Sequence, residues 1–238
     1  MSKAIIKHSG PVTLLGGGQV SATDLADALT IAPILVAVDG GLVTAQAAGV
    51  DPVAVIGDMD SAPPDALVHV PDARLHRLSE QQTTDFDKAL RAVDTPVALG
   101  VGFCGGRVDH QLAAFHTLLV HRGRPCILIA QHEIIVLAPP ALTLDTQAGD
   151  IVSLFPLVAV QGSGTGLEWP IDGLGFDPEV FVGTSNRATG RLSLSMQKPG
   201  MLLIVPRRHL EQMVEHFVQG GARWDTGTPI EQAGTPVG

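Results

Sequence analysis

Cysteines, basic side chains and long apolar runs are all scarce in this chain of 238 residues. The two cysteines, Cys104 and Cys126, lie in apolar stretches, which predicts buried, reduced thiols rather than a disulfide framework. No run of about 18 apolar residues occurs, so we expect no membrane span. Residues 1–8 lack the apolar core of a signal peptide. We therefore expect a cytoplasmic protein with no membrane partner.

The shortage of positive charge bears on the class of ligand. Lysine and arginine total 15, aspartate and glutamate total 24, and the net charge is −9. Binding of nucleic acid depends on clustered basic side chains, so we expect no nucleic-acid partner. A nucleotide needs only a few local cations and a metal. With 45% hydrophobic and 16% charged residues, the composition is that of a globular protein with one large domain or two small ones.

The first part of the chain alternates short apolar runs with helical patterns. Strands are expected near 12–15, 34–38, 53–56, 97–101 and 126–130, with helices between them, the clearest from residue 84 to about 93. Nearly continuous apolar strands are typical of a sheet covered on both faces. The pattern predicts an α/β fold in which residues 1–138 form a mainly parallel, Rossmann-like sheet domain. Neither a dinucleotide fingerprint nor a P-loop motif is present, however.

The pattern changes after Pro139-Pro140. Short runs with β character follow near 142–144, 151–155, 192–196 and 201–205, and a helix is expected over 208–218. Residues 139–225 are therefore predicted to form a small antiparallel β-sandwich domain. Residues 226–238 are predicted to be a disordered tail.

Two carboxylates follow the apolar run at 53–56. In an extended chain, Asp58 and Asp60 would point the same way and could share a hard divalent cation such as Mg²⁺. Like charges held this close need a positive partner. The alternative is an ordinary Gly-Asp turn.

Other candidate residues lie at helix starts. Asp85 and Lys88 open the helix capped by Thr84, where free N–H groups suit phosphate, although a first-turn aspartate is also ordinary helix chemistry. Arg107 and Asp109 follow two glycines at a strand-to-helix turn and could bind phosphate and substrate, or form a surface pair.

Trp169 lies in a glycine-rich stretch predicted to be a flexible loop. It is either a core plug or a stacking platform for a cationic aromatic ligand. Spacing alone favours the core plug.

Six segments, taken together, resemble those of the thiamin pyrophosphokinase family. They are VDGG at 38–41, IGDMDS at 56–61, TDFDKAL at 84–90, GGRVDH at 105–110, TGLEWP at 165–170 and TSN at 184–186, in the family's order. The resemblance implies a catalytic α/β domain, a thiamin-binding β-sandwich domain and a homodimer. It also implies transfer of pyrophosphate from ATP to the hydroxyethyl oxygen of thiamin, giving thiamin diphosphate and AMP, with Mg²⁺.

The resemblance also implies roles for individual residues. Asp58, Asp60 and Asp85 would hold the metal, and Lys88 and Arg107 would contact phosphates. Asp39, Gly40 and Gly41 would lie near the nucleotide. The thiamin site would be lined by Gln81, Asp109, Trp169, Ser185 and Asn186, with Trp169 and Ser185 reaching across the dimer interface. Two positions depart from the family's pattern: Gln82, where an acidic residue is common, and His110, where a glutamine is common.

The sequence leaves the general base open among Asp58, Asp85 and Asp109, and a strong base is not required. Two other functions stay open as well. A glycosyltransferase also uses Asp-x-Asp with a metal and a nucleotide sugar, and a non-catalytic nucleotide or thiamin sensor would bind without turnover.

Overall fold

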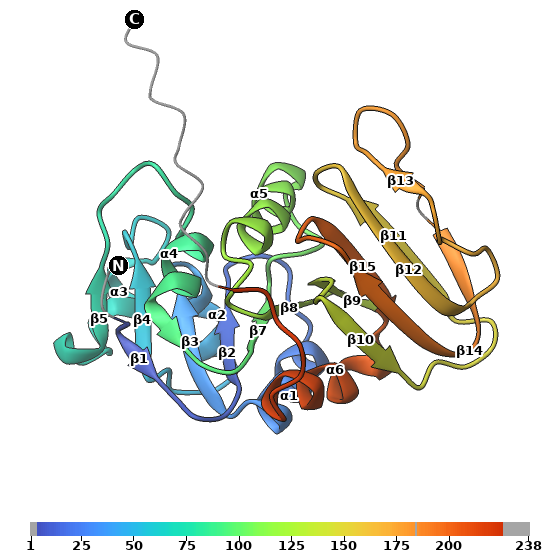
Figure 1. Cartoon of the computed structure of the whole chain (residues 1–238). Coiled ribbons are helices and arrows are strands. Elements are labelled where there is room, and N and C mark those ends of the chain that lie inside the picture. Colours follow the sequence, from blue (N-terminus) through green and yellow to red (C-terminus); the bar gives the residue numbers. More distant parts are fainter. Residues whose placement is uncertain (1–3, 184, 226–238) are drawn as a thin grey trace, which may run out of the picture.

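The computed structural model describes residues 4–183 and 185–225, so the tail predicted at 226–238 lies outside the described residues. Strands and helices alternate up to β8 and strands dominate afterwards (Figure 1). The helices are α1 (Ala22–Ile31), α2 (Gly41–Ala47), α3 (Pro64–Leu67), α4 (Asp85–Ala92), α5 (Val108–Val120) and α6 (Leu210–Val218). The strands are β1 (Ile6–Lys7), β2 (Val12–Leu15), β3 (Ile34–Val38), β4 (Ala54–Gly57), β5 (Leu75–Arg77), β6 (Val93–Asp94), β7 (Ala98–Val101), β8 (Cys126–Ile129), β9 (Glu133–Leu137), β10 (Ala141–Leu144), β11 (Ile151–Pro156), β12 (Val160–Leu167), β13 (Gly175–Phe176), β14 (Ser185–Met196) and β15 (Met201–Pro206).

The large sheet is mixed rather than mainly parallel. Strands β5-β4-β3-β2-β7-β8 pair in parallel in that order. From β9 onward, including the β8–β9 pair, the pairing is antiparallel. The prediction of an α/β fold is confirmed, but the mainly parallel description fits only the strands up to β8.

One feature of the sheet was not foreseen from the sequence: it continues across residue 138. Strand β9 pairs with β8 on one side and with β15 on the other. The long strand β14 pairs with β11 through its first residues and with β10 and β12 through its last, so it joins two layers of strands. The domain boundary at 138 stays a prediction. Strands from the two sides of this boundary, β9 and β15, are hydrogen-bonded to each other.

Alternate residues of the parallel strands face two different helical layers. Leu15 and residues of β7 and β8 belong to the same buried cluster as residues of α1 and α6, whereas Leu14 belongs to the cluster that contains residues of α4 and α5. Near-continuous apolar strands are expected where both faces are buried. The one polar side chain in β2, Thr13, is fully buried and donates its hydroxyl to the carbonyl oxygen of Ala32 at 2.7 Å.

The order of strands reverses direction at β2. The chain proceeds from β2 outward through β3, β4 and β5, and then returns to place β7 and β8 on the other side of β2. Ligands of such sheets bind beyond the carboxyl ends of the strands at this switch point. Here the loops after β2 and β7 meet closely, since the amide of Gly18 donates to the carbonyl of Gly102 at 3.1 Å.

Two local predictions were wrong. The stretch before Trp169, expected to be a flexible loop, is strand β12, paired with β14. In α5 the helical spacing of Leu112, Phe115, His116 and Leu119 predicts one apolar face, but only Phe115 and Leu119 pack against the core. Leu112 is 61% exposed and His116 is also exposed, whereas Ala114 and Leu118 are buried. By contrast, Cys104 and Cys126 are buried free thiols, as predicted.

An ion-pair cluster ties α1 to the turn after β15. Arg207 contacts Asp24 and, at 3.0 Å, Asp27. Asp24 also accepts from the amide of Ser21, which completes the cap of α1. Burial on its own would raise the pKa of Asp24, but the Arg207 guanidinium and the Ser21 groups outweigh it and lower that pKa.

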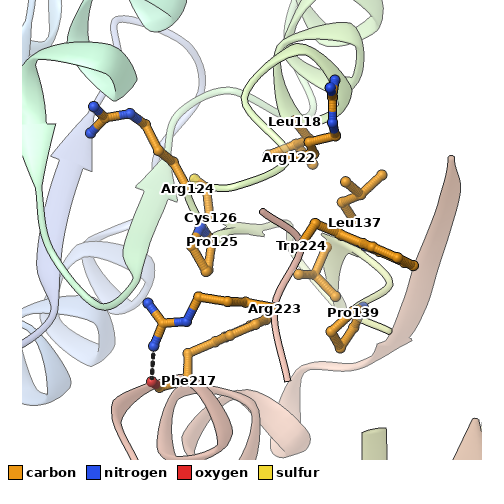
Figure 2. A pocket seen from close by; sticks show the side chains of 11 residues that line it. Leu118, Arg122, Arg124, Pro125, Cys126, Leu137, Pro139, Phe217, Arg223 and Trp224 are labelled. Atoms are coloured by element: carbon orange, nitrogen blue, oxygen red, sulfur yellow. Dashed lines mark hydrogen bonds between the residues drawn. The ribbon is translucent and has the colours of Figure 1, made fainter. Parts of the chain in front are cut away.

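The segment after α6 folds back over the start of β8 (Figure 2). Trp224 donates its indole N–H to the carbonyl of Ala138 at 2.8 Å, and Arg223 donates to the carbonyl of Phe217. The cavity left beneath them has about 10 Å³ of free volume, roughly enough for one water molecule. None of the predicted site residues lines it, so it is a packing gap. Within the described residues no helix is long and apolar enough to cross a membrane.

Candidate active site

The loop after β3 holds Asp39 in a fixed position. Its backbone is left-handed (φ 47°), its amide donates to the carbonyl of Ile56, and its Oδ1 accepts from the amide of Ser61 at 3.3 Å. Gly41 allows this loop to lie against β2, because a Cβ there would be only 1.8 Å from the carbonyl oxygen of Leu15. Asp39 is therefore buried beside the ends of β2 and β4.

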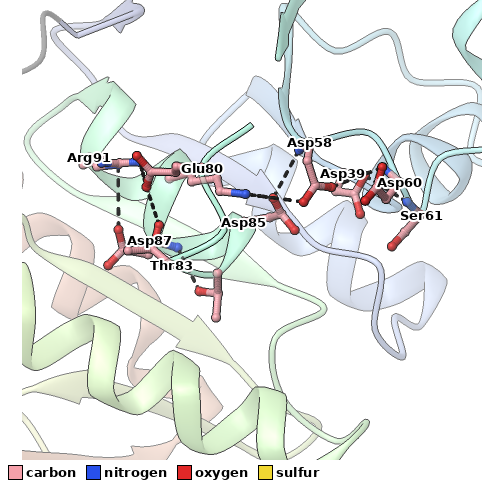
Figure 3. A network of polar contacts seen from close by, with 11 residues as sticks. Asp39, Asp58, Asp60, Ser61, Glu80, Thr83, Asp85, Asp87 and Arg91 are labelled. Atoms are coloured by element: carbon pink, nitrogen blue, oxygen red, sulfur yellow. Dashed lines mark hydrogen bonds and ion pairs between the residues drawn. The ribbon is translucent and has the colours of Figure 1, made fainter. Parts of the chain in front are cut away.

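Three aspartates from separate parts of the chain converge (Figure 3). Each of Asp39, Asp58 and Asp85 offers a carboxylate oxygen, and these oxygens lie within 4.8 Å of one another. Gly57 permits this packing, since a Cβ there would lie 2.9 Å from the Cβ of Asp39 and 3.3 Å from Oδ1 of Asp85. The amide of Asp58 also donates to that oxygen at 3.3 Å. We call these three residues the carboxylate cluster.

Asp60 is not part of the carboxylate cluster. The residue before it, Met59, has a left-handed backbone (φ 69°) and a buried side chain, so the chain is not extended between Asp58 and Asp60. The expected strand alternation does not apply there. Asp60 is exposed, and its amide donates to Oδ1 of Asp58 at 3.2 Å.

Helix α4 supplies the cluster with one carboxylate and one cation. The Thr84 hydroxyl accepts from the amide of Asp87 at 3.2 Å and caps the helix as predicted. The Lys88 ammonium lies 3.0 Å from Oδ1 of Asp85 and 3.5 Å from Oδ2 of Asp58. Burial alone would lower the pKa of Lys88, but the hydrogen bond and negative charge of Asp85, with Asp58, raise it.

The far side of α4 carries a polar network that sequence reasoning did not identify. Asp87 is buried and contacts Nε2 of His121 at 2.9 Å, which links α4 to the end of α5. Arg91 contacts both Asp87 and Glu80 (Figure 3). A hydrogen bond from Thr83, together with Arg91, lowers the pKa of Glu80. These contacts anchor the loop that carries Gln81, which is itself exposed. An aspartate and a histidine 34 positions apart give no local pattern that would have revealed the pair.

Arg107 and Asp109 lie at the start of α5. Two hydrogen bonds join them, the shorter being 2.6 Å from Nη2 to Oδ2, and both side chains are exposed. The hydrogen bond raises the pKa of Arg107 and lowers that of Asp109. Neither residue contacts the carboxylate cluster through a described hydrogen bond or ion pair.

Trp169 follows β12 and is 53% exposed, so it is not a core plug. The buried side chain of Asn186 accepts from the Trp169 amide at 3.1 Å and donates to its carbonyl at 2.7 Å. Asn186 thus fixes the backbone that carries the indole. Ser185 is exposed beside it, and Thr184 lies outside the described residues. Figure 1 places β12 and β14 on the opposite side of the molecule from β4 and α4.

The donor set fits a hard divalent cation. Carboxylate oxygens are the ligands that Mg²⁺ prefers, and it commonly shares them with substrate phosphates. Asp39 is buried, whereas Asp58 and Asp85 are partly exposed, so the cluster opens toward solvent on one side. Asp58 and Asp85 combine with Asp39 in this geometry, whereas the sequence had suggested Asp60 as the third ligand.

Part of the chain matches a known protein family. Residues 25–128 match the family described as thiamin pyrophosphokinase, catalytic domain. Over these residues the chain is similar to the catalytic domain of thiamin pyrophosphokinases. This match contains the whole carboxylate cluster and Lys88, and it supports a thiamin diphosphokinase enzyme. A comparison with curated proteins found no match.

Solved thiamin pyrophosphokinases share the fold over most of the chain. The structure from Geobacillus thermodenitrificans is 24% identical, with a TM-score of 0.66 over 82% of this chain and 96% of that one. The Candida albicans structure is 16% identical, with a TM-score of 0.71 over 87% and 94%. The yeast structure is 12% identical, with a TM-score of 0.66 over 92% and 94%. The shared fold therefore extends past the matched catalytic domain into the strands after β9.

Proposed function

We propose that this protein transfers pyrophosphate from ATP to the hydroxyethyl oxygen of thiamin, giving thiamin diphosphate and AMP, in a reaction that depends on Mg²⁺. The observation that carries the proposal is the carboxylate cluster with Lys88, placed beyond the carboxyl ends of β3 and β4 within the segment that matches the family. Pyrophosphoryl transfer needs little covalent help from a protein. Positioning and neutralisation of phosphate charge carry most of the catalysis.

The carboxylate cluster would hold the metal, with Asp60 close by on the same loop. When bound, Mg²⁺ neutralises phosphate oxygens and orients the triphosphate. Gly40 and Gly41 bring the backbone after β3 close to β2, which supports a nucleotide site along this edge. The exposed Arg107 guanidinium is available for phosphate. Asp58, Asp85 and Asp109 stay candidates for a general base.

Thiamin is a permanent cation, and an exposed indole suits it. Trp169, Ser185, Gln81 and Asp109 are proposed to line its site, and Asn186 is proposed to orient Trp169. In one chain, the loop with Trp169 lies far from the elements that carry the carboxylate cluster (Figure 1). This separation supports a homodimer in which the Trp169 loop of one copy completes the site of the other.

The direct test is to incubate the protein with ATP, Mg²⁺ and thiamin and to measure AMP and thiamin diphosphate. Stoichiometric formation of both is the expected result. Transfer of a sugar from a nucleotide sugar without AMP would instead identify a glycosyltransferase. Binding of thiamin and ATP by calorimetry without any AMP would identify a sensor.

Replacement of Trp169 by alanine tests the thiamin site. A cation–π contact contributes about 0.5–2 kcal/mol, so Trp169→Ala is expected to raise the KM for thiamin roughly 2- to 30-fold. The KM for ATP should change little. Val180→Ala, at another exposed apolar position between β13 and β14, is the matched control. Equal shifts in both KM values would contradict the assignment.

A further inference from the structure

Lys88 occupies an unusual position for a phosphate-binding lysine. Its side chain is 1% exposed and is the largest of the fully buried side chains among the described residues. The ammonium lies against two of the three carboxylates that are proposed to hold the metal, at 3.0 Å from Asp85 and 3.5 Å from Asp58. Buried lysines are rare unless they are paired, and here the pairing is with the metal site itself.

The charges of the three aspartates explain why a lysine lies beside the carboxylate cluster. Three carboxylates within 4.8 Å carry a formal charge of −3, and repulsion among them is strong where water is partly excluded. The Lys88 ammonium reduces the formal sum to −2, the charge that one divalent cation neutralises. Lys88 and a metal ion would therefore compete for the same carboxylates. Carboxylate oxygens that contact the ammonium are less available to the metal.

We propose that Lys88 is the internal counter-ion of the carboxylate cluster, that it keeps Asp58 and Asp85 together before substrate arrives, and that it sets how tightly the nucleotide-free protein binds a divalent cation. The inference rests on the proposed metal-dependent reaction. It differs from the role implied by the family resemblance, in which Lys88 contacts phosphate. The contacts with Asp85 and Asp58 use two of the three N–H donors of the ammonium, which leaves at most one for a phosphate.

The two roles predict different results in the absence of nucleotide. Binding of Mn²⁺, a spectroscopic substitute for Mg²⁺, is measured by calorimetry and electron paramagnetic resonance without ATP or thiamin. If Lys88 is the counter-ion, Lys88→Met removes a competing positive charge, and Mn²⁺ should bind on the order of 10-fold more tightly than to the unaltered protein. Unchanged or weaker Mn²⁺ binding overturns the proposal, as does a failure of either protein to bind Mn²⁺.

Lys7→Met is the matched control. Lys7 lies on β1, is exposed and pairs with Asp94 at 3.9 Å. This variant therefore removes one positive charge from the protein at a position outside the carboxylate cluster. Its Mn²⁺ affinity should equal that of the unaltered protein. A gain equal to that of Lys88→Met would attribute the effect to net charge and overturn the proposal.

Thermal unfolding provides a second readout. Without metal, Lys88→Met should unfold at a lower temperature, and Mn²⁺ should raise its Tm more than that of the unaltered protein. Should the methionine variant fail to fold, Lys88→Gln gives the same comparison, because its neutral amide can still donate to Asp85. A smaller Mn²⁺-induced Tm shift in the variant would contradict the proposal.

The outcome is separable from that of the proposed function. If Lys88→Met binds Mn²⁺ more tightly but the unaltered protein forms no AMP, the proposed reaction is refuted and the counter-ion role is retained. AMP formation with unchanged Mn²⁺ affinity would remove the counter-ion role alone.

Discussion

Replacing Asp85 by asparagine is expected to lower kcat/KM for AMP formation on the order of 10³-fold, about 4 kcal/mol of barrier. Its Oδ1 accepts from the amide of Asp58 and from Lys88, and the carboxylate belongs to the cluster. Asparagine keeps the shape and one acceptor oxygen, so the fold should persist while the negative charge is lost. Initial rates of AMP formation at saturating Mg²⁺ measure the effect.

Asp65→Asn is the control for this variant. Asp65 is an exposed first-turn residue of α3, outside the carboxylate cluster, and its loss should leave the rate within about twofold, as is usual for surface substitutions. Activity of Asp85→Asn close to that of the control would refute the assignment of the cluster as the catalytic metal site.

A paired comparison identifies the third carboxylate. Asp39 belongs to the cluster and is buried, whereas Asp60 is exposed and outside it. We therefore expect Asp39→Asn to reduce the rate of AMP formation more than Asp60→Asn, with the apparent Mg²⁺ requirement shifting in the same order. The reverse order would show that a substrate-bound rearrangement brings Asp60 to the metal.

The second large effect is expected at Gly41. A Cβ placed there would lie 1.8 Å from the carbonyl oxygen of Leu15, which is backbone and has little room to move. Gly41→Ala should therefore lower the free energy of unfolding by about 3 kcal/mol, as overpacking of a rigid site does. Urea denaturation measures this change.

Gly190→Ala is the matched control, because a Cβ at that position meets nothing within 4 Å. It should change the free energy of unfolding by less than about 0.5 kcal/mol. If Gly41→Ala proves as mild as the control, the loop after β3 must be free to move, and Asp39 is then less firmly held than the structure indicates.

Local periodicity predicted much of the fold but not the long-range pairing. The apolar runs before Gly16, Asp39 and Gly57 are strands whose ends carry the site, because two buried faces require such runs. The glycines of β12 misled the prediction. A Cβ at Gly166 would lie 2.1 Å from the carbonyl of Arg191, so glycine there serves close strand packing rather than flexibility.

The composition of the carboxylate cluster was only partly predictable. Asp58 and Asp85 follow from their positions at a strand end and a helix start. The place of Asp39 rather than Asp60 depends on the left-handed backbone at Met59, a non-glycine residue for which no sequence signal exists. Likewise, the face of α5 that is buried was displaced from the expected one because tertiary packing outweighs local pattern.

The continuity of the sheet through β9 limits how the enzyme can move during turnover. Strand β9 is hydrogen-bonded on both sides, to β8 and to β15. A hinge rotation of the two halves would break one of these ladders, at a net cost of about 1 kcal/mol for each bond. We therefore expect surface loops, rather than the sheet, to move when substrates enter and products leave. Crosslinks placed across β9 should leave turnover unchanged.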